Sequence, residues 1–278
     1  MAIISEKAQA MPASAIRKLL PYADAAKKQG VKVYHLNQGQ PDIDSPECAL
    51  DAVKNFKAAN VSYSHSAGLM ELRKGMVEKY YKKIGIDITV DELIVTIAGS
   101  ESVNLALEIT CNPGDEVIVL EPFYTNYNTF AFMNGLTLKA IPTNMKEGFQ
   151  IPSIEEFEKV LTDKTKAILI CNPGNPTGTQ YTKEMMLRLG EFARKHDLFL
   201  LSDEVYREFC YTDEPHFSAM NIPGLEQNVI LIDSVSKRYN LCGARVGCIV
   251  SHNKDVMAAA MKFAQARLCP PVLGQIAS

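Results

Sequence analysis

The chain has 278 residues, a formal net charge of −3 and a hydrophobic fraction of 47%. This length and apolarity allow a sizeable core and exclude a disordered chain, while the lack of basic excess argues against nucleic acid or anionic membrane as a partner. No apolar run approaches membrane-spanning length. Seven scattered cysteines without a C-x-x-C pair indicate free thiols in a reducing, cytoplasmic compartment.

Two common classes of site have no support in the sequence. The five histidines lie far apart, with no H-E-x-x-H and no local pairing with cysteine, so no metal site is expected. The phosphate-binding loops G-x-x-x-x-G-K-[ST] and G-x-G-x-x-G are also missing. A catalytic function must therefore depend on other residues.

The first part of the chain predicts a few separate elements. Residues 14–30 have the period of an amphipathic helix that ends at a glycine, residues 31–46 are interpreted as a strand and a loop, and residues 69–85 as a second glycine-capped helix. The first forty residues have too little bulk for a core of their own. We expect them to dock on another surface.

From Leu93 onward, short β-rich runs alternate with stretches of helical period. This alternation predicts right-handed crossovers and a mainly parallel sheet between two layers of helices, a three-layer α/β/α fold. The predicted strands are 93–98, 116–120, 136–141, 166–172, 198–203 and 228–234, and the predicted helices between them are 100–110, 124–135, 153–161 and 183–196.

The final segment, residues 256–278, starts a long helical pattern that breaks at Pro270 and Pro271. It stops in apolar sequence that resembles the start of another helix. A domain seldom ends in this way. We therefore expect the chain to be a fragment of a longer protein.

Polar residues follow the predicted strands at the points where a parallel sheet binds its ligands. They fall at 99–101, 121–124, 172–178, 203–206 and 234–237. Since the carboxyl ends of parallel strands share one edge of the sheet, we expect these residues to form a site.

The strand-end residues match the requirements of pyridoxal phosphate, a cofactor with an aldehyde and a pyridine ring. Lys237 offers an amine for the aldehyde, and Asp203 a carboxylate for the ring nitrogen. Tyr206 and Asn175 can reach the phenolic oxygen, and Tyr124 can stack on the ring.

A phosphate cup is expected at the helix start after "TIAGSES", because free N–H groups and the helix dipole favour an anion there. Ser234, Ser236 and Arg245 would add direct contacts, with the arginine contributing about 1.5–3 kcal/mol. Ser236 has an equally good interpretation as a local structural residue.

Each residue alone also has a structural interpretation. Lys237 is a plausible solvated loop lysine, Asp203 a cap, and Arg245 a surface ion-pair partner, whereas Tyr124 and Tyr206 are plausible core residues. The hypothesis of a site depends on their coincidence at one sheet edge.

Over essentially its whole length, the sequence resembles the class I/II aminotransferases, fold-type I pyridoxal-phosphate enzymes that include aspartate aminotransferase. The resemblance runs in family order through seven blocks: "LNQGQPDIDSP", "YSHSAGLMELR", "VTIAGSESVNLAL", "NPGDEVIVLEPFYTNY", "CNPGNPTG", "LSDEVYREF" and "SVSKRYNLCGARVG". It implies pyridoxal 5′-phosphate as the cofactor.

Carried over by position, the resemblance makes Lys237 the Schiff-base lysine, Asp203 the partner of the pyridine nitrogen, and Asn175 and Tyr206 the contacts to the phenolic oxygen. It assigns stacking on the ring to an aromatic at position 124. The residues it assigns to the phosphate are Ser100, Glu101 through backbone groups, Ser234, Arg245 and, from the neighbouring subunit, Tyr63.

The resemblance also implies a homodimer with shared active sites and a role for Gly39 against the substrate carboxylate. Residues 1–41 would be an N-terminal arm and helix contributing to the small domain, and 42–278 the large cofactor-binding domain. Relatives continue past Ser278, so the C-terminal small domain, with the arginine that grips the substrate α-carboxylate, is expected to be absent from this chain.

The implied function is ping-pong transamination between an amino acid and a 2-oxo acid. A carbon–sulfur lyase or synthase on the same scaffold is the alternative, because the same residues hold the cofactor in both. A ligand-sensing domain of a transcription regulator is a more distant alternative, which requires a DNA-binding segment longer than "MAIISEKAQAMPASAIRK".

Overall fold

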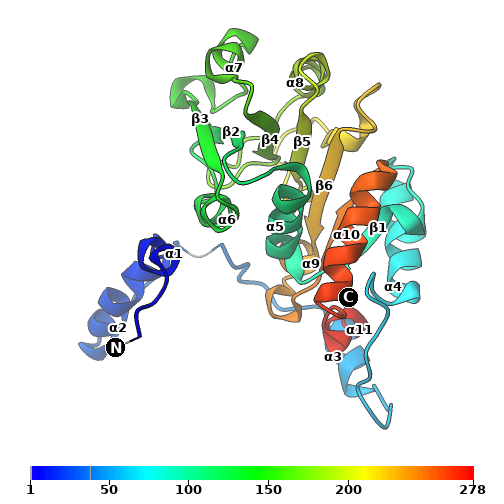
Figure 1. The fold of residues 1–278 in the computed structure, drawn as a ribbon. Coiled ribbons are helices and arrows are strands. Elements are labelled where there is room, and N and C mark those ends of the chain that lie inside the picture. Colours follow the sequence, from blue (N-terminus) through cyan, green and yellow to red (C-terminus); the bar gives the residue numbers. More distant parts are fainter. Residues whose placement is uncertain (1, 38) are drawn as a thin grey trace.

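The computed structural model describes residues 2–37 and 39–278, and a seven-stranded sheet lies at its centre (Figure 1). The strand order is β1-β7-β6-β5-β4-β2-β3. Every strand has the same direction except β7, which is antiparallel to both neighbours. The strands are β1 (Leu93–Thr96), β2 (Glu116–Glu121), β3 (Thr137–Pro142), β4 (Thr165–Cys171), β5 (Phe199–Asp203), β6 (Val229–Ser234) and β7 (Gly247–Val250).

Helices cover both faces of the sheet, so the predicted three-layer α/β/α fold is confirmed. Side chains of β4 alternate, with Ala167 and Leu169 in one core layer and Ile168 and Ile170 in the other. The first layer contains α5 (Ala98–Thr110), α6 (Asn126–Asn134) and α10 (Lys254–Ala266). The second contains α7 (Ile154–Val160), α8 (Lys183–Lys195) and the helical stretch that starts with α4 (Met70–Gly75).

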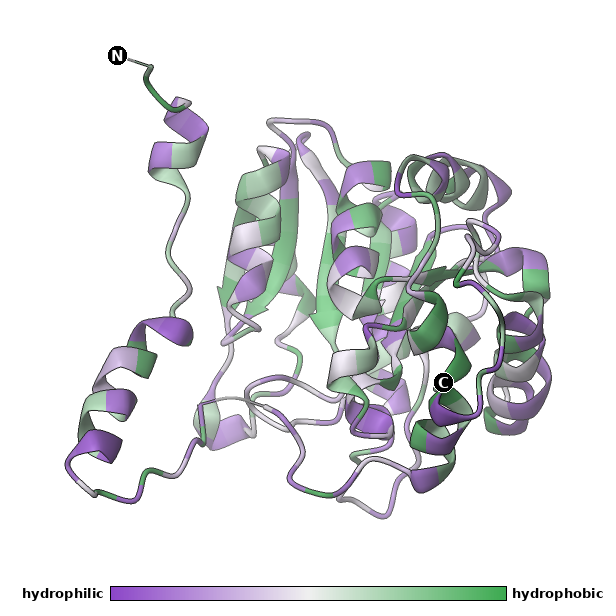
Figure 2. Ribbon diagram, turned by 90° about the horizontal axis from the view of Figure 1, so that it is seen from below, coloured by the Kyte–Doolittle hydropathy of each residue, from purple (hydrophilic) through white to green (hydrophobic). Residues whose placement is uncertain are grey.

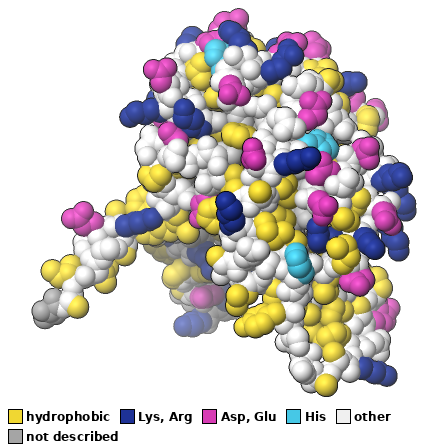
Figure 3. Space-filling model, turned by 45° about the vertical axis from the view of Figure 1, so that its right-hand side comes forward, with side chains coloured by type: hydrophobic (Ala, Val, Ile, Leu, Met, Phe, Trp, Pro, Cys, Tyr) yellow, Lys and Arg dark blue, Asp and Glu magenta, His cyan; other side chains and the backbone are white. Residues whose placement is uncertain are grey.

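The hydropathy of the chain follows these layers: the strands are strongly apolar, while the helices are polar on their outward faces (Figure 2). Among the described residues, none of the helices has both the length and the apolarity that a membrane span requires. Charged side chains of both signs alternate on the face in Figure 3, without a region of one sign.

The remaining helices are short. The predicted break at Pro270 and Pro271 is confirmed, because α10 ends at Ala266 and α11 (Val272–Ile276) begins after the prolines. The stretch after α4 continues as a π turn at Met76–Tyr80 and a 3-10 turn at Tyr81–Ile84. The other short elements are α3 (Glu47–Lys54), α9 (Val235–Arg238), and 3-10 turns at Arg17–Leu19, Val90–Glu92, Met145–Glu147, Ala219–Asn221 and Cys242–Ala244.

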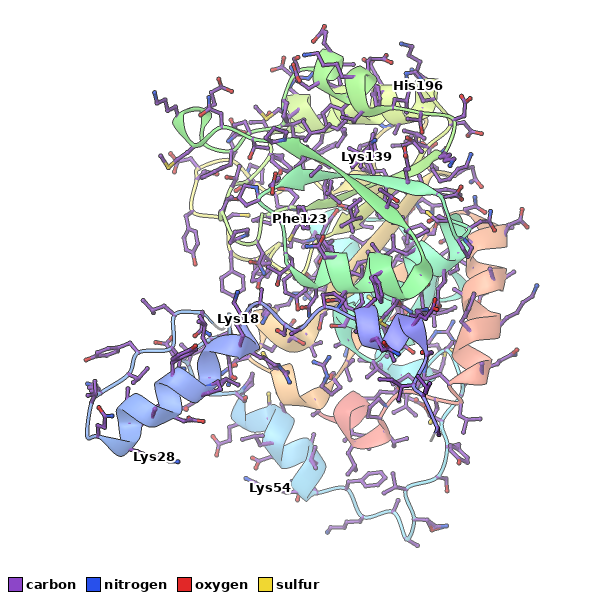
Figure 4. The ribbon with its side chains drawn as sticks, turned by 60° about the vertical axis from the view of Figure 1, so that its left-hand side comes forward. Lys18, Lys28, Lys54, Phe123, Lys139 and His196 are labelled. Carbon is purple, nitrogen blue, oxygen red and sulfur yellow. The ribbon has the colours of Figure 1, made fainter. Side chains whose placement is uncertain are left out.

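The N-terminal segment projects from the body as an arm (Figure 1). Neither α1 (Glu6–Ala10) nor α2 (Leu20–Lys28) contains a buried residue. The Lys7 ammonium donates a 2.5 Å hydrogen bond to the Met133 carbonyl, which sets α1 against α6. Figure 4 shows Lys28 at the far end of α2, away from the sheet.

The strand predicted within residues 31–46 is wrong. The described residues of that range contain no strand. A strand needs a neighbour to pair its backbone groups, and here the chain runs along the arm instead of along a sheet edge.

Candidate active site

The strands β4, β5 and β6 end side by side at one edge of the sheet. Cys171 is in register with Asp203, and Asp203 with Ile232. The pairing continues past the strands, since the Asn172 amide donates to the Asp203 carbonyl and the Glu204 amide to the Ile232 carbonyl, both at 2.9 Å. The loops that follow therefore start from neighbouring positions.

Asp203 is a buried carboxylate at the end of β5, with 6% of its surface exposed. Its Oδ2 accepts a 2.7 Å hydrogen bond from the Tyr127 hydroxyl, and its Oδ1 a long one, 3.4 Å, from the Val205 amide. Burial raises its pKa to about 6 against the opposing effect of these two bonds. Among the described residues, no lysine or arginine forms an ion pair with it.

Lys237 lies on the single-turn helix α9, directly after β6. The Ser234 hydroxyl caps this turn by accepting from the Ser236 amide at 3.1 Å. The Lys237 ammonium donates a 2.5 Å hydrogen bond to the Gly39 carbonyl. A Cβ at Gly39 would lie 3.4 Å from the Tyr206 hydroxyl, so the structure brings Gly39, Lys237 and Tyr206 together.

Asn175 and Tyr206, from the loops after β4 and β5, are also neighbours. The Asn175 amide donates to the Tyr206 hydroxyl at 3.4 Å. Burial, followed by the charges of nearby acidic groups, raises the pKa of Tyr206, so its hydroxyl stays protonated at neutral pH. The pair can offer hydrogen bonds to a single acceptor.

Tyr124 follows β2 and is half-buried. Its ring lies edge-on to that of Tyr127, with centroids 5.5 Å apart, and its hydroxyl accepts from the Asn126 amide at 2.8 Å. Burial raises the pKa of Tyr124, the charge of Asp203 adds to this effect, and Arg245 opposes it. Tyr124 therefore lies close enough to Asp203 for the charge of that carboxylate to act on its hydroxyl.

The first turn of α5 packs closely against the ends of β6 and β7. A Cβ at Gly99 would lie 3.2 Å from Val205 Cγ1 and 3.8 Å from Ser234 Cβ, and a Cβ at Gly247 would overlap the Gly99 amide at 2.8 Å. The Glu101 side chain is engaged here: its carboxylate accepts from the Ile97 amide at 2.5 Å and from Arg267 Nε at 3.1 Å. Ser100 lies beside it in the same turn.

Ser234 lies near this turn and Arg245 lies close enough to Tyr124 for its charge to act there, whereas Tyr63 does not join the group. The Ser234 hydroxyl is 2.9 Å from the Val246 carbonyl, which it can donate to. Arg245 is exposed, has a left-handed backbone with φ of +55°, and donates from Nη1 to the Cys242 carbonyl at 3.0 Å. Tyr63 lies in a loop with 79% of its surface exposed.

The family model for aminotransferase class I and II matches residues 31–278, nearly nine-tenths of the chain. The chain belongs to the class I and II aminotransferase family. Its similarity to aspartate/prephenate aminotransferase of Thermus thermophilus is 32% identity, covering 99% of this chain and 71% of the relative. The putative aminotransferase YugH of Bacillus subtilis is 33% identical, with 99% of this chain and 70% of that protein covered.

Solved structures agree with this aminotransferase assignment. The aspartate aminotransferase of Thermotoga maritima superposes with a TM-score of 0.92 at 33% identity, covering 99% of this chain and 73% of that one. A single mutant of the Thermus thermophilus aspartate aminotransferase superposes with a TM-score of 0.91 at 32% identity, covering 100% of this chain and 72% of that one. The fold-type I architecture and the identity as an aminotransferase are therefore confirmed.

One residue of this aminotransferase site was missed from the sequence. Tyr127 is 1% exposed and its hydroxyl donates to the Asp203 carboxylate, yet the sequence led to no role for it within the predicted helix 124–135. The available signal is its spacing, because Tyr127 follows Tyr124 by three residues in the predicted helix 124–135 and such residues share a face. In the structure Tyr124 precedes α6, and the Tyr127 amide donates to the Tyr124 carbonyl at 2.9 Å.

Proposed function

We propose that this chain carries the cofactor site of a pyridoxal-phosphate-dependent aminotransferase, which moves an amino group from an amino acid to a 2-oxo acid. The observation that carries the proposal is the buried carboxylate of Asp203, without a cationic partner among the described residues, at the sheet edge that also holds Lys237. A buried carboxylate is costly unless a positive group meets it. A protonated pyridine ring is such a group.

The other residues fit the remaining parts of the cofactor. Lys237 would bind its aldehyde carbon, Tyr206 and Asn175 its phenolic oxygen, and Tyr124 one face of its ring. The phosphate would lie at the first turn of α5, where Ser100 and the backbone of Glu101 meet Ser234 and Arg245. Bound pyridoxal phosphate supplies an electron-withdrawing ring that stabilises negative charge at the substrate Cα.

The protein's own contribution is proton transfer and charge placement. The Lys237 amine would take the proton from the substrate Cα and later return a proton, as a general base and then a general acid. Asp203, ionised and paired with the ring nitrogen, would keep that nitrogen protonated throughout. Gly39, whose carbonyl already accepts from Lys237, would lie against the substrate carboxylate together with Asn175.

We propose ping-pong kinetics, in which the first 2-oxo acid leaves before the second one enters. Several relatives are named for aspartate, so aspartate with 2-oxoglutarate is the donor and acceptor pair to assay first. The same residues serve a carbon–sulfur lyase, which would release pyruvate and ammonia from a cysteine thioether. The aminotransferase names of the relatives support transfer.

A homodimer with shared active sites is part of the proposal. The 79% exposure of Tyr63 and the separate course of the arm support contacts with a second copy. Residues 42–278 would form the large cofactor-binding domain, and residues 1–41 would contribute to a small domain. The seven cysteines, all free thiols, support a cytoplasmic location.

Borohydride reduction followed by peptide mapping tests the cofactor site. Incubation with pyridoxal phosphate and reduction should attach one pyridoxyl group to the peptide that contains Lys237. The Lys237→Ala variant should lose the label, while a control change at the surface, Lys195→Ala, should keep it. A stable label on any other lysine, or no label on the wild-type chain, would contradict the assignment.

A further inference from the structure

A network of four buried charged side chains lies directly behind the residues proposed for catalysis. Glu204 follows Asp203 in the chain, and Arg238 follows Lys237. Glu204 pairs with Arg207 at 2.5 Å, and Asp233 pairs with Arg238 at 2.7 Å. The side chains of all four are at most 6% exposed. Two positive and two negative charges balance, which makes their burial tolerable.

The Asp233–Arg238 pair is the better connected to the proposed lysine. Arg238 Nη2 donates to both Asp233 oxygens, at 2.9 and 2.7 Å. The Tyr81 hydroxyl donates to Asp233 Oδ2 at 2.9 Å, and the Ser234 amide to Oδ1 at 2.7 Å. The guanidinium carbon lies 3.9 Å from the centre of the Tyr80 ring, so cation–π contact holds its outer face.

This pair attaches the last residue of α9 to β6. The helix has four residues, Val235–Arg238, and a single turn has little stability of its own. Its first residues are fixed by the Ser234 cap, and its last residue by the bond from Arg238 back to β6. Lys237 lies between these two attachments, and its amine reaches the Gly39 carbonyl.

We propose that Arg238, through its pair with Asp233, is a positioning residue that holds Lys237 in its reactive place. The inference rests on the proposed function of Lys237. Without the pair, the last half-turn of α9 loses its attachment to β6, and the lysine amine moves relative to Asp203. A displacement of about 1 Å costs on the order of 100-fold in rate.

The test compares Arg238→Met, Arg238→Lys and Asp233→Asn with wild type in the full chain loaded with pyridoxal phosphate. We expect Arg238→Met to lower kcat about 10- to 100-fold with little change in KM, and to shift the pH at which the absorption band of the lysine-bound cofactor changes. Arg238→Lys, which keeps the charge, should recover most of kcat. Asp233→Asn should lower kcat and shift the band in the same way as Arg238→Met. It provides the same test if Arg238→Met does not fold.

Arg73→Met is the matched control. The Arg73 side chain, on α4, has the same 6% exposure as that of Arg238. It donates hydrogen bonds to the Val90 and Leu93 carbonyls and, among the described residues, forms no hydrogen bond or ion pair with α9 or Asp233. The Arg73→Met substitution should lower the free energy of unfolding while leaving kcat and the absorption band unchanged. If both Arg238→Met and Asp233→Asn keep the wild-type absorption band and kcat, the positioning role of Arg238 is overturned, while the proposed function of Lys237 stands. Absence of a lysine-bound band in wild type would overturn the proposed function as well.

Discussion

Two aspartates at the ends of neighbouring strands have opposite surroundings. Asp203 on β5 and Asp233 on β6 are 6% and 0% exposed. Burial alone would raise the pKa of Asp233, yet Arg238 and Arg207 outweigh it and lower that pKa. Burial raises the pKa of Asp203 to about 6, and no cation among the described residues opposes it.

The difference teaches that the partner, and not the degree of burial, separates a structural carboxylate from one available to a ligand. Asp233 already has its positive charge and four hydrogen bonds within the chain. Asp203 has two, one of them long, and its remaining capacity suits an external cation.

The largest expected effect is the loss of turnover in Asp203→Asn. The amide has the size of the carboxylate but cannot keep the pyridine nitrogen protonated, so kcat should fall about 100- to 1,000-fold. Lys237 should still be labelled after borohydride reduction. Steady-state transamination of aspartate measures the change.

Asp213→Asn is the control for that substitution, because Asp213 is exposed in the loop between β5 and β6. It should leave kcat within about twofold of wild type. Equal turnover in wild type and Asp203→Asn would remove the role given to this carboxylate.

The next effect is the pH dependence of stability in the cofactor-free chain. The pKa of Asp203 is about 6 in the folded state and near 3.8 when unfolded, so the folded state binds the proton more tightly. Ionisation therefore destabilises the fold progressively between about pH 4 and pH 6, by up to about 3 kcal/mol. Below pH 4 the penalty is absent.

Urea denaturation of wild type and Asp203→Asn at several pH values isolates this contribution from that of other carboxylates. As the pH rises from 4 to 7, the free energy of unfolding of Asp203→Asn should increase relative to that of wild type. A difference that stays constant with pH would mean that Asp203 is not held at a raised pKa.

Much of the fold and of the site was predictable because both follow from local pattern. The strand and helix alternation after Leu93 has periods that the side chains themselves impose, and parallel strands carry their last residues to one edge. Asp203, Asn175, Tyr206 and Lys237 could therefore be grouped before any coordinates.

Features that depend on long-range partners were not predictable. The four residues of β7 give too short a pattern to show that they run antiparallel between β1 and β6. The strand expected within residues 31–46 failed for the same reason, because propensity cannot supply a neighbouring strand. Asp233 falls inside the predicted strand 228–234, and the sequence does not show its pairing with Arg238 and Tyr81, which depends on the fold.

The smallest expected effect tests the hydrogen bond that distinguishes Asp203 from a wholly unsatisfied carboxylate. Tyr127→Phe removes the 2.7 Å bond to Oδ2 and little volume. Because that bond favours the ionised form, its loss should raise the pKa of Asp203 further and weaken pairing with the ring nitrogen by about 1–2 kcal/mol. The affinity for pyridoxal phosphate at pH 7 should fall about 5- to 30-fold.

Tyr181→Phe is the matched control, since Tyr181 is also buried, at 6% exposure, but its hydroxyl is not among the hydrogen-bond partners of Asp203 in the described residues. The affinity of the Tyr181→Phe variant for pyridoxal phosphate should stay within about twofold of that of wild type. Raising the pH to 8 should recover part of the affinity lost in Tyr127→Phe, because it ionises Asp203 again. A loss that is the same at pH 7 and pH 8 would mean that Tyr127 acts by packing against Tyr124, and that the charge of Asp203 does not depend on it.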